Sequence, residues 1–139
     1  MVKYAELFKG VITALAADGT FNGLIAGRVY TRVPRSPTFP FVRIVSLPAS
    51  PAFGTLNASH PNWRWQGTLD FTAFSLSTSP VQASNVIDAL GDVIEDKTNM
   101  SVTGATLVSV IPRTSGIVQD ETTQTWTGLA SYDFILDES

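Results

Sequence analysis

Apolar side chains recur every three to four residues near the start of the chain and again after residue 80. The first stripe predicts an amphipathic helix from about Val2 to Ala17, which Asp18-Gly19 would end with the glycine as a left-handed cap. The second predicts a helix that Ser79 opens, with Gln82 completing a capping box, and that ends at about Asp96. We expect these stripes to share a core made of Leu7, Val11, Leu15, Ile87, Leu90 and Ile94.

Alternating apolar and polar residues indicate strands elsewhere. Two stretches between the predicted strands, 48–62 and 112–122, are rich in Pro, Gly and polar residues. The first is typical of a long loop, and the second predicts an exposed hairpin link between the last two strands. Two amphipathic helices must bury their stripes, and one face of a sheet is the natural partner. The sequence therefore predicts an α+β fold in one domain over residues 1–139: a single, mostly antiparallel sheet of about five strands with two helices packed on one face, in the order α-β-β-β-α-β-β. The predicted strands are 28–33, 39–47, 63–76, 105–111 and 123–136.

The composition argues against most kinds of catalytic or metal-binding site. The 139 residues are 44% hydrophobic and 15% charged, as in a folded domain, and contain no cysteine, which excludes disulfides and thiol nucleophiles. The one histidine, His60, lies in a predicted loop, and no nucleophile elbow, P-loop or dinucleotide fingerprint occurs. We therefore expect no catalytic, metal or cofactor site and no enzymatic activity. No apolar stretch approaches the length of a membrane span, so no membrane partner is expected.

Charge is divided unevenly along the chain. Residues 1–69 carry +5 and residues 70–139 carry −8, for a net charge of −3. Such polarity suits head-to-tail contacts between copies, although chance placement explains it equally well. Asp88, Asp92 and Asp96 recur every fourth residue on the second predicted helix. They allow a metal site or, as the favoured interpretation, a solvated face whose like charges disfavour the helix.

The segment "GRVYTRVPRSPTFPFVRI" at residues 27–44 interleaves four arginines with aromatic residues. This pattern is found in single-strand nucleic-acid sites, and also in two strands joined by a proline-rich turn. The arginines form no dense run, and the negative net charge gives no general attraction to DNA. We therefore favour an edge hairpin that pairs with another protein chain.

The order of these features resembles the tail-terminator, or tail-completion, proteins of long-tailed bacteriophages. The resemblance is carried by "LAADGTFNGLIAGRVYTRVPRSPTFPFVRI" at 15–44, "WQGTLDFTAFS" at 65–75 and "ASNVIDALGDVI" at 83–94, and it extends over almost the whole chain. It implies a structural virion protein, made in the host cytoplasm and located at the head–tail junction. Such a protein forms a homo-hexameric ring that caps the tail tube, ends its polymerisation and joins the tail to the head connector.

The resemblance implies several partners: further copies of the chain, the major tail-tube protein and a head-completion or connector protein. DNA would pass through the ring without sequence-specific binding. One alternative is another ring-forming neck protein, such as a head-side stopper or connector, and a second is a small ligand-binding or enzymatic α+β domain. The candidate subunit or partner contacts are Arg28, Tyr30, Arg32, Arg35, Phe53, His60, Arg113, Asp120 and Glu121.

The two long predicted loops, 48–62 and 112–122, are the segments expected to reach neighbouring subunits. They are too polar to build a core of their own. We therefore expect them to be mobile in the free subunit and to become ordered in the assembled tail.

Overall fold

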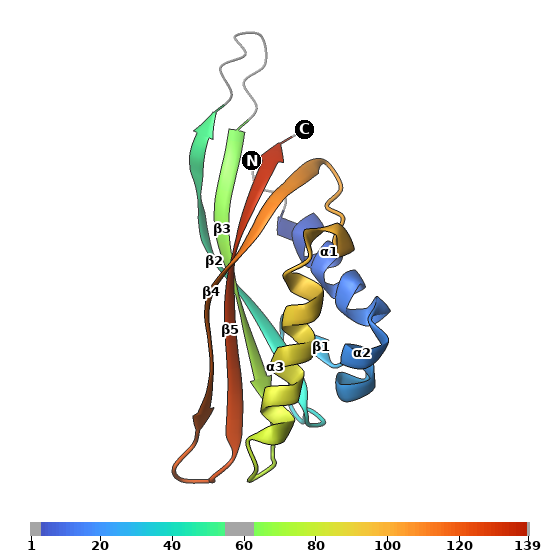
Figure 1. The fold of residues 1–139 in the computed structure, drawn as a ribbon, viewed down its shortest axis with the longest axis vertical. Helices are drawn as coiled ribbons and strands as arrows, with labels where there is room; N and C mark the ends of the chain where they lie inside the picture. Colours follow the sequence, from blue (N-terminus) through green and yellow to red (C-terminus); the bar gives the residue numbers. More distant parts are fainter. Residues whose placement is uncertain (1–3, 55–62, 139) are drawn as a thin grey trace.

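A computed structural model describes residues 4–54 and 63–138, and in these residues a layer of helices covers one face of a long sheet (Figure 1). The helices are α1 (Tyr4–Ala17), α2 (Gly19–Ile25) and α3 (Val81–Ile94), and a short 3-10 turn, η1 (Lys97–Asn99), follows α3. The α+β prediction is confirmed, with five strands in the described residues: β1 (Val29–Tyr30), β2 (Phe41–Gly54), β3 (Trp63–Phe74), β4 (Ala105–Gln119) and β5 (Trp126–Glu138).

The strands lie in the order β1-β2-β3-β5-β4, so β1 and β4 form opposite edges of the sheet. All neighbouring pairs are antiparallel except β1 and β2, which confirms the mostly antiparallel prediction. The centre of the sheet joins segments far apart in sequence, because Phe71 on β3 lies opposite Ile44 on one side and Ala130 on the other. Chain order alone would have placed β4 rather than β5 beside β3.

The predicted hairpin over residues 28–44 is wrong. Strand β1 is only two residues long, and Val29 lies opposite Val42 in a parallel pair. Residues 31–40 form the connection, which we call the arginine loop because it carries Arg32 and Arg35. Its three prolines lack the N–H that a strand ladder requires, so the chain loops back before it re-enters the sheet in the original direction.

Much of the two predicted long loops is strand instead. Strand β2 continues to Gly54 and β4 continues to Gln119, where the 112–119 stretch pairs with β5 along its length. Irregularities in the register, such as that between Pro112 and Thr114, let the prolines stay within long strands. Most of the link predicted at 112–122 is therefore strand, and only 120–125 form the turn. Its mobility in the free subunit stays a prediction. Residues 55–62, including His60, lie outside the described residues.

Two predictions about helix ends are also wrong. Gly19 does not cap α1 but begins α2, a helix that was not predicted from the sequence. Asp18 starts α2 by accepting a hydrogen bond at Oδ1 from the Phe21 N–H at 2.8 Å, and α2 ends at the left-handed Ala26. The predicted capping box at α3 is absent, because Gln82 Oε1 instead accepts a hydrogen bond from the Ser75 hydroxyl.

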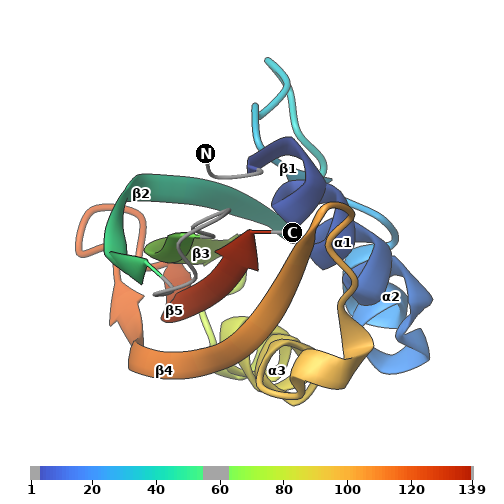
Figure 2. The ribbon, with the colours of Figure 1, turned by 90° about the horizontal axis from the view of Figure 1, so that it is seen from above.

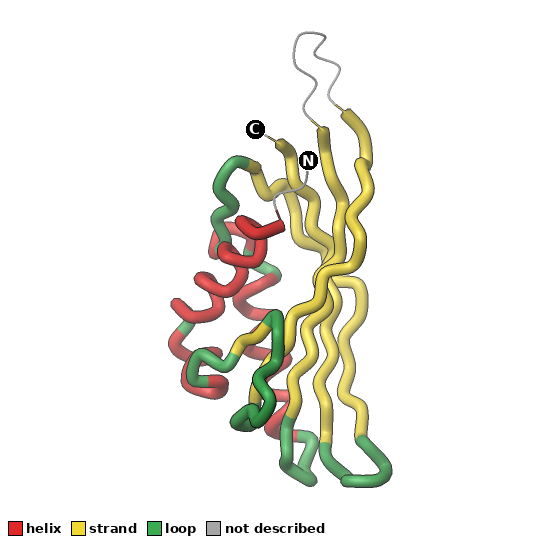
Figure 3. Tube along the Cα trace, turned by 180° about the vertical axis from the view of Figure 1, so that it is seen from behind, coloured by secondary structure: helices red, strands yellow, loops and turns green. Residues whose placement is uncertain are grey.

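The hydrophobic core lies between the helices and the covered face of the sheet. Figures 1 and 3 show from opposite sides that the helices lie on one side of the strands. The alternation predicted for the third and last strands is confirmed, because Phe71 and Phe134 are each about 1% exposed. The six residues expected in the core are all buried there: Leu7, Val11, Leu15, Ile87, Leu90 and Ile94.

Candidate functional site

The predicted contact residues fall at separate places on the molecule. Arg28 and Tyr30 lie at the β1 edge, and Arg32 and Arg35 lie in the arginine loop beside it. The backbone of Phe53 pairs with that of Arg64 near the end of β2, and His60 is outside the described residues. The remaining three, Arg113, Asp120 and Glu121, belong to β4 and the β4–β5 turn.

At the β1 edge, Arg28 and Tyr30 fix the base of the arginine loop. Arg28 Nε donates a hydrogen bond to the Pro40 carbonyl at 2.8 Å, and the Arg28 carbonyl accepts one from the Val42 N–H at 3.0 Å. The Tyr30 ring packs against Phe41 with a centroid separation of 5.8 Å. These contacts close the loop at both of its ends, so Arg28 and Tyr30 have a structural role that their sequence pattern did not reveal.

Arg32 and Arg35 are exposed on the loop itself. Neither side chain forms an ion pair with any residue that the structure describes. The loop therefore holds two free cations at the β1 edge of the sheet.

Asp120 has a structural role in the β4–β5 turn. Its side chain accepts hydrogen bonds from the N–H groups of Thr122 at 2.8 Å and Thr123 at 3.2 Å, and its own N–H donates to the Thr125 carbonyl. This is the usual way in which an aspartate stabilises a turn. Glu121 is exposed beside it.

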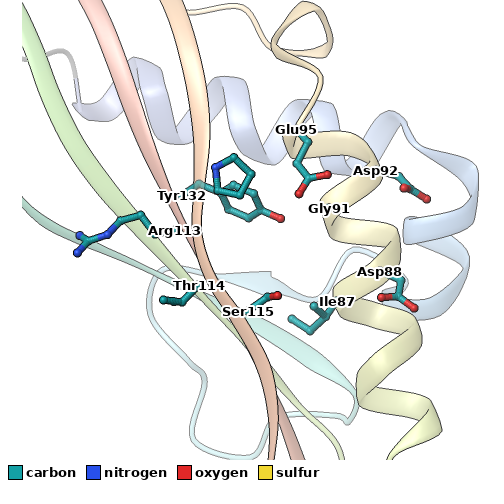
Figure 4. Close-up of a pocket in the computed structure, with 10 residues that line it drawn as sticks. Ile87, Asp88, Gly91, Asp92, Glu95, Arg113, Thr114, Ser115 and Tyr132 are labelled. Carbon is teal, nitrogen blue, oxygen red and sulfur yellow. The ribbon is translucent and has the colours of Figure 1, made fainter.

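A groove between α3 and β4 lies at the opposite edge of the sheet (Figure 4). It encloses about 380 Å³, and Asp88 and Asp92 of α3, with Glu95 directly after the helix, line one wall while residues 112–115 of β4 line the other. In Figure 4 the Tyr132 hydroxyl points into the groove, and Arg113 points away from it. Sequence reasoning singled out the aspartates of α3 but missed the groove, because no local signal indicates which strand lies beside that helix.

Gly91 brings α3 close to the tyrosine at the bottom of the groove. A Cβ atom at Gly91 would lie 3.3 Å from the Tyr132 hydroxyl oxygen, so a larger residue would crowd it. Tyr132 is only 4% exposed. Its burial, followed by the negative charge of Glu95 and a hydrogen bond with it, raises the pKa of Tyr132 to about 12.

The raised pKa of Tyr132 predicts a loss of stability in alkali. The unfolded chain would ionise this phenol near its ordinary pKa of 10, while the folded protein resists ionisation until about 12. The stabilisation is complete below pH 10 and is lost as the pH rises toward 12, by roughly 2–3 kcal/mol in total. Urea unfolding at pH 9 and pH 11.5 should show a steeper loss for the wild type than for Tyr132→Phe. Equal losses of stability in the two proteins would contradict a raised pKa at Tyr132.

The uncovered face of the sheet carries a network of charged and polar side chains. Arg64 donates two hydrogen bonds to Asp137, at 2.6 and 2.8 Å, and this pairing holds the pKa of Asp137 below its usual value. Asp133 accepts a 2.6 Å hydrogen bond from the Thr68 hydroxyl and lies 3.7 Å from Arg113. Arg113, predicted as a partner contact, thus belongs to a network within its own sheet.

Neither a metal centre nor a membrane span emerges from residues 4–54 and 63–138. No group of three or more His, Cys, Asp or Glu side chains is placed there to hold a metal ion. The aspartates of α3 therefore do not form such a group. Within the same residues, no helix has both the length and the apolar character needed to cross a bilayer.

Comparison with known proteins identifies the family. The family model for tail completion protein gp17 matches residues 9–137, which is nearly the whole chain. The chain belongs to this family. The resemblance seen in the sequence is therefore confirmed, and family membership places the chain among the structural proteins of phage tails.

The fold is also found in a solved particle. A chain in the virion of a native gene transfer agent particle superposes with a TM-score of 0.73, at 15% sequence identity and with 96% of each chain covered. At this identity the likeness concerns the fold. No match was found among curated proteins.

Proposed function

We propose that the protein forms a homo-hexameric ring on the end of the tail tube, where it stops polymerisation and joins the tail to the head connector. The observation that carries this proposal is the match to the tail completion family over residues 9–137. The likeness of its fold to a chain of a gene transfer agent virion also supports a place in a phage-like particle.

In this proposal the chain acts as one domain with several partners. One sheet holds all five described strands, which supports a single unit over residues 1–139. Copies of the chain contact one another within the ring, one side of the ring contacts the major tail-tube protein, and the other contacts a head-completion or connector protein. DNA passes through without sequence-specific contacts. The protein is made in the host cytoplasm and resides at the head–tail junction of the virion.

Among the predicted contact residues, those that are exposed and whose side chains pair with no other described residue remain proposed contacts in the assembly. These are Arg32 and Arg35 at the β1 edge and Glu121 in the β4–β5 turn. Arg28 and Asp120 act on the assembly only through the loop and the turn whose shapes they set. The role of Phe53 and His60 as subunit or partner contacts stays a prediction.

The proposal is tested by assembling tails without the protein. Tubes examined by electron microscopy are expected to overrun their normal length, and purified protein added during assembly should restore a uniform length. Uniform tubes that fail to attach to heads would instead indicate a head-side stopper or connector. Normal tails with normal attachment would contradict a role at this junction altogether.

A further inference from the structure

Two surfaces of opposite charge lie at opposite edges of the sheet. The arginine loop joins β1, at one edge, to β2, and the groove between α3 and β4 lies at the other edge. In the view along the long axis, the connection between β1 and β2 projects from one side of the molecule, and α3 and β4 lie on the opposite side (Figure 2). One copy of the chain cannot bring these two surfaces together.

The charges of the two surfaces are complementary and unpaired. The stretch 28–43 contains four arginines and no acidic residue. On the groove side, Asp88 and Asp92 are exposed on α3. Among the described residues, neither these two aspartates nor Arg32 and Arg35 form an ion pair.

The row of acidic side chains at 88, 92 and 95, which we call the acidic row, destabilises the helix in the isolated subunit. Asp88 and Asp92 are spaced four residues apart and repel each other, and Glu95, next to the last residue of α3, opposes the helix dipole. Cations supplied from outside the chain would relieve both effects. The wall that faces the groove from β4 supplies none, because Arg113 points away from the groove and lies 3.7 Å from Asp133.

The arginine loop is suited to supply those cations. Its ends are held by the Arg28–Pro40 hydrogen bond and by the parallel pairing of β1 with β2, so docking would order little additional backbone. Arginine presents a planar fork that pairs with carboxylates through two parallel hydrogen bonds. A groove of about 380 Å³ with carboxylates along one wall offers both space and acceptors for such a side chain.

We propose that the arginine loop of one copy docks into the α3–β4 groove of the next copy, with Arg32 and Arg35 facing Asp88 and Asp92. This contact is head-to-tail, so each subunit uses its loop toward one neighbour and its groove toward the other, as closure into a ring requires. The inference rests on the proposed ring and identifies which surfaces of the subunit form its interface.

Charge reversal tests the contact directly. We expect the Arg32→Glu/Arg35→Glu variant and the Asp88→Arg/Asp92→Arg variant each to lose self-assembly. The concentration at which rings form, measured by mass photometry at low salt, should rise about 10- to 100-fold. Mixed one to one, the variants should assemble again, because each reversed loop meets a reversed groove and each native loop meets a native groove. A six-membered ring accommodates this alternation.

The mixture also serves as a matched control for charge. Its average net charge equals the wild-type value of −3, so restored assembly cannot follow from a change in overall charge. Lys9→Glu, on α1 with its side chain 72% exposed, makes the net charge more negative, as each single Arg→Glu substitution in the loop does, and should leave assembly unchanged. Circular dichroism of each variant should match the wild type, since all four substituted positions are exposed.

The outcomes separate this inference from the proposed function. If both reversed variants form rings at the same concentration as the wild type, the inference is overturned, while the proposed ring remains supported. Loss of assembly in both variants without recovery in the mixture would also overturn it. Wild-type protein that forms no ring, either alone or on tail tubes, would overturn the proposed function and this contact with it.

Discussion

Leu90→Ala is expected to lower the free energy of unfolding by about 2–5 kcal/mol. Leu90 is 0% exposed on α3 and belongs to the core cluster between the helices and the covered face of the sheet. Truncation removes buried methyl groups and leaves a cavity, and a core this closely packed relaxes only partly to fill it. Urea denaturation at neutral pH, with the midpoint and slope both fitted, measures the loss.

Leu76→Ala provides the matched control for Leu90→Ala. Leu76 follows β3 and is 62% exposed, so the same chemical change there should alter stability by no more than about 0.5 kcal/mol. Similar losses at the two positions would show that α3 does not pack against the sheet as described. A negligible loss at Leu90 would contradict the helix-on-sheet architecture.

Gly10→Ala is expected to destabilise the protein by about 2 kcal/mol, although Ala is the better helix former. A Cβ atom at Gly10, within α1, would lie 2.4 Å from the backbone carbonyl oxygen of Ser101. A backbone oxygen cannot rotate away as a side chain does, so α1 must move away from the segment around Ser101. The neighbouring Met100 and Val102 are buried, so this movement disturbs the core. The overpacking cost, typically about 1–3 kcal/mol and occasionally more, exceeds the helix-propensity gain of about 0.5–1 kcal/mol.

Gly23→Ala should have the opposite sign and serves as the control. Gly23 lies inside α2 and a Cβ atom there meets nothing within 4 Å, so only the propensity gain remains. We expect stabilisation of up to about 1 kcal/mol. Thermal unfolding of the two variants side by side would show shifts of Tm in opposite directions. Stabilisation by both substitutions would contradict the close contact between α1 and Ser101.

The predictability of the elements follows from the range of the interactions that determine them. Helix α3 and the final strand were found from their periodicity, which depends only on neighbouring residues. Helix α2 was missed, because its seven residues include two glycines and its stability comes from burying Phe21 and Ile25 beside α1 and α3. The strand at 112–119 was missed because Pro112 and Gly116 suggested a loop, whereas pairing with β5 and a local irregularity accommodate both.

The candidate site shows the same limit. The exposed arginines of the loop and the acidic row of α3 were visible in the sequence, as was the opposite charge of the two halves of the chain. Arg28 and Asp120 were predicted as contacts, yet both side chains are used within the fold. Local patterns indicate charge, but a side chain's partner within the chain depends on the tertiary structure.

By itself, the sequence determined the α+β class, the buried faces of α1, α3, β3 and β5, and the resemblance to tail-completion proteins, because periodicity and motif order are local properties. Only the tertiary structure decided that β1 runs parallel to β2, that β5 lies between β3 and β4, and that α3 and β4 enclose a groove. These features depend on pairing between distant segments, where many arrangements satisfy the same pattern of apolar residues. That pairing also places the arginine loop and the acidic groove on opposite edges of the sheet.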